Sequence, residues 1–251
     1  MYKLVVFDMD GVLLDSERLK ALSYAQAISY LSSDLYDEDE VKNEFVNVVG
    51  ASRETVVEHM LQKYPLDEKV VSQILSSSNK ELNLAKTLSE VRVNIYRQML
   101  SDPQIVKNAE HKEIIYLLHW LKGNNVTVGI ATMSAEKEAK EVLSYLGVLD
   151  KIDFVLTRNS VKNSKPHPEI YLKAAEGFNR NEVLVVEDSL TGINAAMAAH
   201  LDVVVLLTEI TKQRVIASRR VVKEYLFDEQ VKLSNYVKTK FQINSILNSS
   251  I

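Results

Sequence analysis

The chain has 251 residues, of which 46% are hydrophobic and 25% are charged, and its formal net charge is -4. This composition is typical of a folded globular protein, and it excludes the collagen-like, low-complexity and disordered classes. The chain contains no Cys. Disulfides, thiolate zinc sites, iron–sulfur clusters and cysteine nucleophiles are therefore excluded as well.

The scarcity of Gly and His excludes several common enzyme motifs. The seven Gly show no spacing of the types G-x-G-x-x-G, G-x-x-x-x-G-K-[ST] or G-x-S-x-G, and the five His give no H-E-x-x-H. The slightly acidic balance gives no reason to expect nucleic acid or an anionic membrane as a partner. Asp8 interrupts the first apolar run too early for a signal peptide. We expect a cytoplasmic protein that is a monomer or a small homo-oligomer.

A first domain is expected to comprise residues 1–15 and 101–251. Within it, short β-branched runs alternate with helical patterns, which favours a doubly wound parallel sheet covered by helices on both faces. The predicted elements in chain order are the strand 4–7, helix 110–121, strand 126–131, helix 136–146, strand 154–156, helix 168–175, strand 183–186, helix 192–199, strand 203–207 and helix 213–225. The sequence after this last helix is polar and weakly patterned.

Residues 16–100 have a different sequence pattern and are expected to form a second domain. Helical patterns follow one another there without a convincing buried strand, over 18–31, 39–48, 53–63, 68–75 and 80–100. An all-helical block that interrupts an α/β pattern after its first strand predicts a helical domain inserted into the α/β core.

Two carboxylates stand where the first predicted strand ends. Asp8 and Asp10 are separated by one residue, so the alternation of a strand allows both side chains to point the same way. Two carboxylates held close together repel each other unless a cation lies between them or one is protonated. Gly11 allows the chain to turn away sharply. A capped turn at the strand end would explain one Asp but not the pair.

A second acidic pair, Glu187 and Asp188, ends the predicted strand 183–186. In doubly wound sheets, ligands bind at the carboxyl ends of the strands. If the two strands are neighbours, all four carboxylates converge, and such an all-oxygen site suits Mg2+. Taken alone, the second pair could also be a helix N-terminus that uses acidic residues for capping.

Two further segments fit a phosphate ligand. Thr132, Met133 and Ser134 lie between the predicted strand 126–131 and the following helix. A hydroxyl and backbone N–H groups at a helix N-terminus form an anion site. Lys165 stands among two of the four Pro of the chain, which restrict the backbone around it. A single lysine near prolines is most often a solvated surface group. Lys165 therefore supports a phosphate site only in combination with the acidic pairs and the segment 132–134.

Taken in order, these residues resemble the four motifs of the haloacid dehalogenase superfamily. The motifs are Asp8-Met9-Asp10-Gly11-Val12, then Thr132, then Lys165-Pro166, then Glu187-Asp188. With a helical block after the first motif, the chain is similar to the branch that contains β-phosphoglucomutase and small sugar-phosphate phosphatases. The resemblance covers residues 1 to about 207. It implies a Rossmann-like core, a helical cap and phosphoryl transfer, because dehalogenases lack the second Asp of the first motif.

The resemblance also implies a role for each motif residue. Asp8 would be the nucleophile that forms an aspartyl-phosphate, and Asp10 would be the general acid and base. Thr132, with the backbone N–H groups of Met133 and Ser134, would hold the phosphoryl oxygens. Lys165 would offset their charge and that of Asp8.

The same resemblance implies a Mg2+ cofactor. The ion would be held by the carboxylates of Asp8 and Asp188 and by the backbone carbonyl of Asp10, with Glu187 supporting a water of its coordination shell. The expected partner is a small phosphorylated metabolite.

Substrate choice is expected to depend on the cap, where Gly50 and Arg53 resemble a loop that faces the active site in the mutase-like branch. Arg53 could pair with a substrate phosphate, or it could be an ordinary residue of a first helical turn. Lys20 and Val49 depart from the mutase pattern. The sequence therefore favours a phosphatase, with a β-phosphoglucomutase-like mutase as the alternative. A non-catalytic binding protein of the same fold is less favoured, because every catalytic residue type is present.

Overall fold

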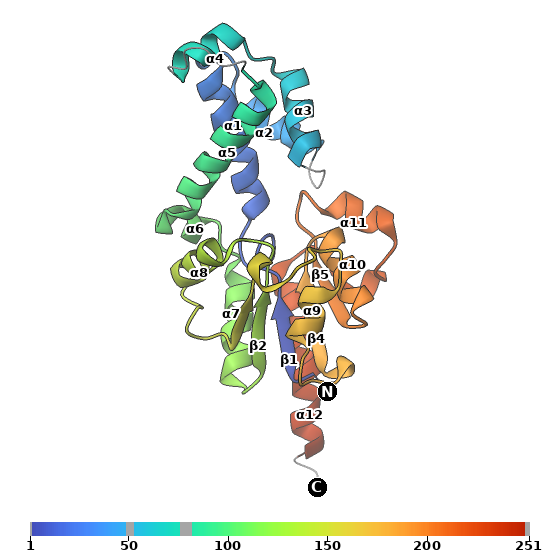
Figure 1. Ribbon diagram of the computed structural model, residues 1–251. Coiled ribbons are helices and arrows are strands. Elements are labelled where there is room, and N and C mark those ends of the chain that lie inside the picture. The colour runs from blue at the N-terminus through green and yellow to red at the C-terminus, as the bar shows by residue number, and fades with distance from the viewer. Residues whose placement is uncertain (1, 49–52, 76–81, 249–251) are drawn as a thin grey trace. The chain divides into compact units, whose positions relative to one another are not determined.

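The computed structural model describes residues 2–48, 53–75 and 82–248 (Figure 1). The chain divides into two compact units, one made of Met1–Asp15 and Pro103–Ile251 and the other of Ser16–Asp102. The first unit contains a six-stranded sheet, and the second is helical.

All strands of the sheet pair in parallel, in the order β3-β2-β1-β4-β5-β6. The strands are β1 (Leu4–Phe7), β2 (Thr127–Ala131), β3 (Phe154–Leu156), β4 (Val183–Glu187), β5 (Asp202–Leu206) and β6 (Leu226–Phe227). The predicted doubly wound parallel sheet is thus confirmed. The chain moves outward from β1 through β2 and β3, and then returns to β4 on the other side of β1. This order places a topological switch point, where ligands of such sheets bind, between β1 and β4.

Helices cover both faces of the sheet. On one face, α9 (Glu169–Ala174) and α10 (Leu190–Ala198) share a buried core with side chains of β1 and β4, including Leu4, Val6, Val183 and Val185. On the other face, α7 (Lys112–Gly123) packs against α12 (Gln230–Asn248), and in Figure 1 α9 lies in front of the sheet and α12 behind it. The unit is completed by α6 (Pro103–Asn108), α8 (Glu136–Tyr145), α11 (Lys212–Ser218) and three 3-10 turns, Arg158–Ser160, Arg180–Glu182 and Lys223–Tyr225.

The C-terminal part of the chain differs from the sequence prediction. The helix expected over 213–225 is wrong in extent, because α11 ends at Ser218 and Arg219 turns the backbone with φ 52°. The weakly patterned polar end forms α12, which buries apolar residues four positions apart, namely Leu233, Val237 and Phe241. The ring of Phe241 meets Trp120 of α7 edge to face, with centroids 6.4 Å apart. The tail is therefore part of the core of this unit.

Among the described residues, the second unit consists of helices only: α1 (Ser16–Leu31), α2 (Glu38–Phe45), α3 (Arg53–Lys63), α4 (Glu68–Ile74) and α5 (Leu84–Leu100). Side chains that favour the N-cap begin three of them, because Asp37, Asp67 and Asn83 accept hydrogen bonds from the first backbone N–H groups. The unit has its own apolar interior, in which the rings of Tyr24 and Phe45 lie 5.4 Å apart.

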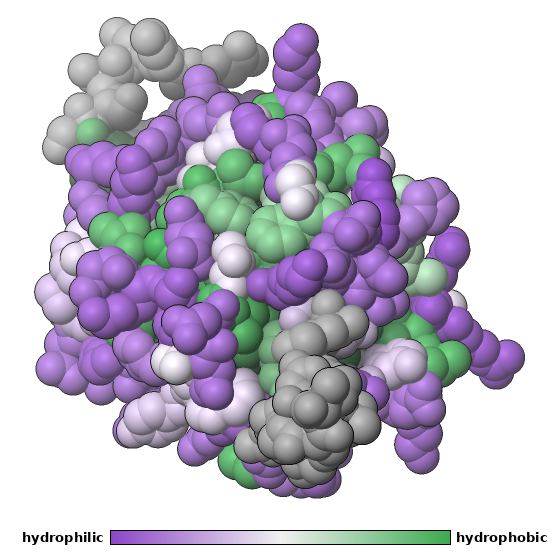
Figure 2. All heavy atoms as spheres, turned by 90° about the horizontal axis from the view of Figure 1, so that it is seen from below, coloured by the Kyte–Doolittle hydropathy of each residue, from purple (hydrophilic) through white to green (hydrophobic). Residues whose placement is uncertain are grey.

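The surface of the described chain is polar, with apolar side chains distributed over many elements. Figure 2 shows that hydrophilic side chains cover most of the face seen from below, with hydrophobic ones between them. The large exposed apolar side chains are Tyr30, Leu35, Val46, Tyr116, Leu172, Met197, Ile216, Val222 and Val231. In the described ranges, no helix combines the length and the apolar character that crossing a membrane requires.

Candidate active site

The ends of β1 and β4 bring acidic residues of the two pairs together. Asp8 follows β1 directly, and its backbone N–H donates to the carbonyl of Val186 in β4 (2.9 Å). Glu187 is the last residue of β4, and Asp188 follows it. Oxygens of Asp8, Glu187 and Asp188 lie within 4.8 Å of one another, and all three side chains are buried. This cluster lies at the topological switch point of the sheet.

Two glycines allow the backbone to approach this cluster. Gly11 has a φ of +83°, which favours glycine, and a Cβ at this position would collide with the carboxylate of Asp188. A Cβ at Gly192, in the first turn of α10, would collide with the carboxylate of Glu187. Both positions therefore lack a side chain because a carboxylate occupies the space.

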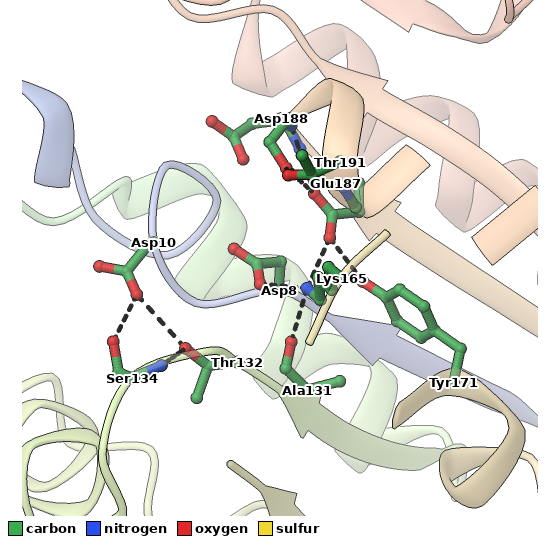
Figure 3. A network of polar contacts seen from close by, with 12 residues as sticks. Asp8, Asp10, Ala131, Thr132, Ser134, Lys165, Tyr171, Glu187, Asp188 and Thr191 are labelled. Carbon is green, nitrogen blue, oxygen red and sulfur yellow. Dashed lines mark hydrogen bonds and ion pairs between the residues drawn. The ribbon is translucent and has the colours of Figure 1, made fainter. Parts of the chain in front are cut away.

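Lys165 lies at the centre of the cluster (Figure 3). Its Nζ donates to Asp8 Oδ1 and to Glu187 Oε1, both at 2.6 Å, and to the carbonyl of Ala131 at 3.0 Å. Only 5% of its side chain is exposed. The segment before α9 thus places a buried ammonium between carboxylates that follow or end two neighbouring strands.

Tyr171 and Ser189 also belong to this network, although the sequence analysis assigned them no role. The hydroxyl of Tyr171, from α9, donates to Glu187 Oε1 (2.6 Å), and the hydroxyl of Ser189 donates to Glu187 Oε2 (3.1 Å). Ser189 also caps α10 by accepting from the backbone N–H of Gly192 (3.1 Å). A serine just before a predicted helix is the usual sequence signal of an N-cap, so the role of Ser189 could have been predicted. Tyr171 had no comparable signal, since nothing in its neighbourhood distinguishes it from a core residue.

Asp10 lies on the other side of Asp8 from Tyr171 (Figure 3). Its Oδ2 accepts hydrogen bonds from the hydroxyls of Ser134 (2.7 Å) and Thr132 (3.3 Å), which follow β2. The backbone N–H of Ser134 donates to Thr132 Oγ1 (3.1 Å), and Met133 between them is half-buried. The second Asp of the first motif is therefore held by hydroxyl groups, apart from the buried cluster of the other three carboxylates.

Burial and the attraction between Lys165 and its neighbouring carboxylates dominate the electrostatics of the site. Burial raises the pKa of Asp8 to about 7, with Glu187 and Asp10 adding to the increase and Lys165 opposing it. Burial alone would lower the pKa of Lys165, but Asp8 and Glu187 hold it well above its usual value. Burial, followed by the charge of Glu187, raises the pKa of Tyr171 well above its usual value. Lys165 is therefore a cation and Tyr171 a hydrogen-bond donor over the whole physiological pH range.

The composition of this cluster fits a hard divalent cation. Three carboxylates and one ammonium leave two negative charges when all four groups are ionised. All candidate ligands are carboxylate oxygen atoms, which Mg2+ prefers.

The residues expected from the second unit are placed as follows. Arg53 is the first residue of α3 and is exposed. Lys20 in α1 forms an ion pair with Glu17 (2.5 Å). Gly50 and Val49 lie outside the described residues.

The chain is similar to known proteins over most of its length. A family model described as "Haloacid dehalogenase-like hydrolase" matches residues 5–206. The chain is 26% identical to a phosphorylated carbohydrates phosphatase of Thermotoga maritima over 79% of its own length and 82% of the relative. It is also 26% identical to hexitol phosphatase B of Escherichia coli K12, over 80% and 82%. The crystal structure of a β-phosphoglucomutase from Clostridium difficile is similar with a TM-score of 0.62 and 25% identity, covering 98% of this chain and all of the other.

Proposed function

Because the chain belongs to the haloacid dehalogenase-like hydrolase family, we propose that it is a Mg2+-dependent phosphatase of small phosphorylated metabolites that forms an aspartyl-phosphate at Asp8. The observation that carries this proposal is the buried Asp8–Lys165 ion pair beside Glu187 and Asp188. A carboxylate in this position can attack phosphorus, and an ammonium beside it can offset the charge of the transferring group. The names of relatives that act on phosphorylated carbohydrates and hexitols favour sugar-phosphate-like substrates.

The chain's own residues would hold the metal. Asp8 and Asp188 would offer carboxylate oxygens, and Glu187 of the same cluster would support a water of the coordination shell. To Asp10 we assign a backbone carbonyl ligand, as the family resemblance implies. When bound, Mg2+ supplies positive charge that offsets the oxygens of the transferring phosphoryl group.

In the first step, an Asp8 oxygen attacks phosphorus while the bond from phosphorus to the ester oxygen breaks. The leaving alkoxide takes a proton from Asp10, whose side chain the hydroxyl of Ser134 keeps in place (2.7 Å). We assign to Thr132, and to the backbone N–H groups of Met133 and Ser134, the binding of the phosphoryl oxygens. Lys165 stabilises the charge shared by these oxygens and Asp8, which is the main requirement of phosphoryl transfer.

In the second step, the deprotonated Asp10 takes a proton from water as the water oxygen attacks phosphorus. The bond between phosphorus and Asp8 breaks, and inorganic phosphate and the free Asp8 carboxylate are released. The proton that Asp10 gave to the alcohol is thereby replaced, so the enzyme returns to its starting state.

We assign this chemistry to a domain of residues 1–15 and 101–251, and the choice of substrate to a cap of residues 16–100. Within the cap, Arg53 and Gly50 are the candidate substrate-binding residues. Arg53 is exposed at the start of α3, and its forked guanidinium suits a second anionic group of the substrate.

Substitution of the nucleophile tests the proposal. Hydrolysis of p-nitrophenyl phosphate is measured with and without Mg2+ for the parent, for Asp8→Asn and for Asp150→Asn as a control. Asp150 is an exposed carboxylate that forms an ion pair with its neighbour Lys151 (2.9 Å). We expect Asp8→Asn to lose at least about 1,000-fold in turnover, because the nucleophile is removed, and the control to match the parent. Undiminished turnover of Asp8→Asn would contradict the assignment.

A sugar-phosphate mutase is the second candidate, and the similarity to the β-phosphoglucomutase structure favours it. A mutase converts a hexose 1-phosphate into the 6-phosphate faster than it releases inorganic phosphate, whereas a phosphatase shows the opposite ratio. Both products can be followed in one incubation by phosphorus NMR. A non-catalytic protein of this fold would give neither product in the presence of Mg2+.

A further inference from the structure

Both oxygens of Glu187 are occupied by donors from the chain itself. Oε1 accepts from Lys165 Nζ and from the Tyr171 hydroxyl, each at 2.6 Å. Oε2 accepts from the Ser189 hydroxyl (3.1 Å) and from the backbone N–H groups of Asp188 (3.1 Å) and Ser189 (3.3 Å). The side chain is completely buried. Its position is therefore fixed from two sides, by α9 and by the start of α10.

Tyr171 contacts both Glu187 and Lys165. Its hydroxyl donates to Glu187, and the face of its ring lies 4.9 Å from the ammonium of Lys165. Tyr171 is completely buried, in the core that α9 shares with the sheet. A buried tyrosine can orient a carboxylate through its hydroxyl group and attract a cation to the face of its ring.

The distances connect Tyr171 to Asp8 through two intermediate side chains. Tyr171 fixes Glu187 Oε1, Glu187 binds one side of the Lys165 ammonium, and the same ammonium reaches Asp8 Oδ1. A charged group that stabilises a transition state must be held to within a fraction of an ångström. Loss of one donor to Glu187 would let the carboxylate and the ammonium shift together.

We propose that Tyr171 is a positioning residue, which orients Glu187 and so keeps the Lys165 ammonium against Asp8. Tyr171 does not touch the reacting atoms in this account and acts through its hydrogen bond to Glu187. The expected effect on turnover rests on the proposed phosphatase function, whereas the effect on Lys165 does not.

The test compares Tyr171→Phe with Tyr116→Phe. The first variant keeps the ring in the core and removes only the hydroxyl, and the second makes the same change at an exposed position of α7 (61% exposed). For each, kcat and KM are measured with p-nitrophenyl phosphate and Mg2+. In the metal-free protein, the side-chain ammonium of Lys165 is observed by 15N NMR, where burial and hydrogen bonding protect its protons from exchange with water.

In Tyr171→Phe we expect kcat to fall roughly tenfold with a smaller change in KM, because the displaced ammonium stabilises the charge of the transition state more than that of the bound substrate. We also expect the Lys165 ammonium signal to broaden or disappear, while Tyr116→Phe matches the parent in both respects. Thermal melting shows that the compared variants are folded. Glu187→Gln is the second variant, because it keeps the shape of the side chain and removes its charge, and it is expected to lose the same signal.

An unchanged kcat together with an unchanged Lys165 signal in folded Tyr171→Phe would overturn the proposal. A parent protein that hydrolyses no phosphomonoester would contradict the phosphatase function instead. The NMR measurement then decides about Tyr171 alone, since loss of the protected signal supports the positioning role and its retention overturns it.

Discussion

The backbone at Gly11 lies directly against the carboxylate of Asp188. A Cβ at Gly11 would come within 3.0 Å of all three carboxylate atoms of Asp188, and the φ of +83° is itself unfavourable for other residues. The turn after β1 and the acidic residue after β4 therefore fit together only when residue 11 has no side chain.

Gly11→Ala is expected to lose both stability and activity. The positive φ costs about 1–2 kcal/mol for any residue with a Cβ, and the collision displaces Asp188 in addition. Gly147→Ala is a matched control, because Gly147 has a similar φ of +74° but no atom within 4 Å of an added Cβ. Urea denaturation and Mg2+-dependent turnover are measured for both. Gly147→Ala should be less stable than the parent but turn over substrate at the same rate. If Gly11→Ala also kept the turnover of the parent, the fit between Gly11 and Asp188 would not matter for activity.

Gly192→Ala tests how closely the chain packs around Glu187, because the sign of the change in the free energy of unfolding depends on that packing. Replacing Gly by Ala inside a helix ordinarily stabilises it by about 0.5–1 kcal/mol. At Gly192, however, the new Cβ would collide with the Glu187 carboxylate, so we expect destabilisation by about 1–3 kcal/mol. Gly123→Ala at the end of α7 meets no atom within 4 Å and should be neutral or stabilising. Equal free energies of unfolding for the two variants would show that the site is not closely packed there.

Lys165→Met should be strongly destabilising. It leaves Asp8 and Glu187 buried without their cation, and removing one partner of a buried ion pair typically costs about 3–5 kcal/mol. Lys140→Met removes an ion pair of the same length, 2.6 Å to Glu136, in which both side chains are more than half exposed. Such a surface pair is worth about 0–1 kcal/mol. The two variants are compared by urea denaturation in metal-free buffer, and equal losses would speak against a buried charge network.

The raised pKa of Asp8 predicts a pH dependence of stability in the absence of metal. Its pKa rises from 3.8 to about 7 on folding, so between these values the folded state holds a proton that the unfolded state releases. The contribution of Asp8 to the free energy of unfolding therefore falls as the pH rises from about 4 to about 7, and it stays low above that range.

The Asn side chain of Asp8→Asn does not titrate, so this variant is the reference for the pH dependence that Asp8 contributes to stability. The stability of Asp8→Asn relative to the parent should increase between about pH 5 and pH 8, by at most on the order of 3 kcal/mol. Adding Mg2+ at pH 8 should stabilise the parent and narrow the difference. A difference that is the same at both pH values would show that Asp8 is already ionised throughout this range in the folded protein.

The sequence predicted the sheet and the meeting of Asp8 with the second acidic pair, because both depend on local patterns. The expected convergence of all four carboxylates is wrong for Asp10, whose side chain turns to the hydroxyls after β2. Continuous apolar β-branched runs identified β1 and β4, and the acidic pairs stand directly where these strands end. The glycine at position 129 in β2 has a reason that no local pattern shows. A Cβ at Gly129 would collide with the ring of Phe154, which lies on the neighbouring strand β3.

Other features depend on contacts that no local pattern shows. Tyr171 reaches Glu187, 16 residues later in the chain, only because α9 packs on the sheet. Among the side chains of α12 that the structure describes, Leu233, Val237 and Phe241 are the buried apolar ones, and polar residues separate them. The periodicity of this helix is weak, and its stability comes from packing against α7.

A direct observation of the covalent intermediate tests the central claim. The enzyme is mixed with Mg2+ and a phosphomonoester, quenched with acid within milliseconds to seconds, digested and analysed by mass spectrometry. A phosphoryl group on the peptide that contains Asp8, absent in Asp8→Asn, is the predicted result. Hydrolysis of the substrate without a phosphoryl group on that peptide at any quench time would contradict it.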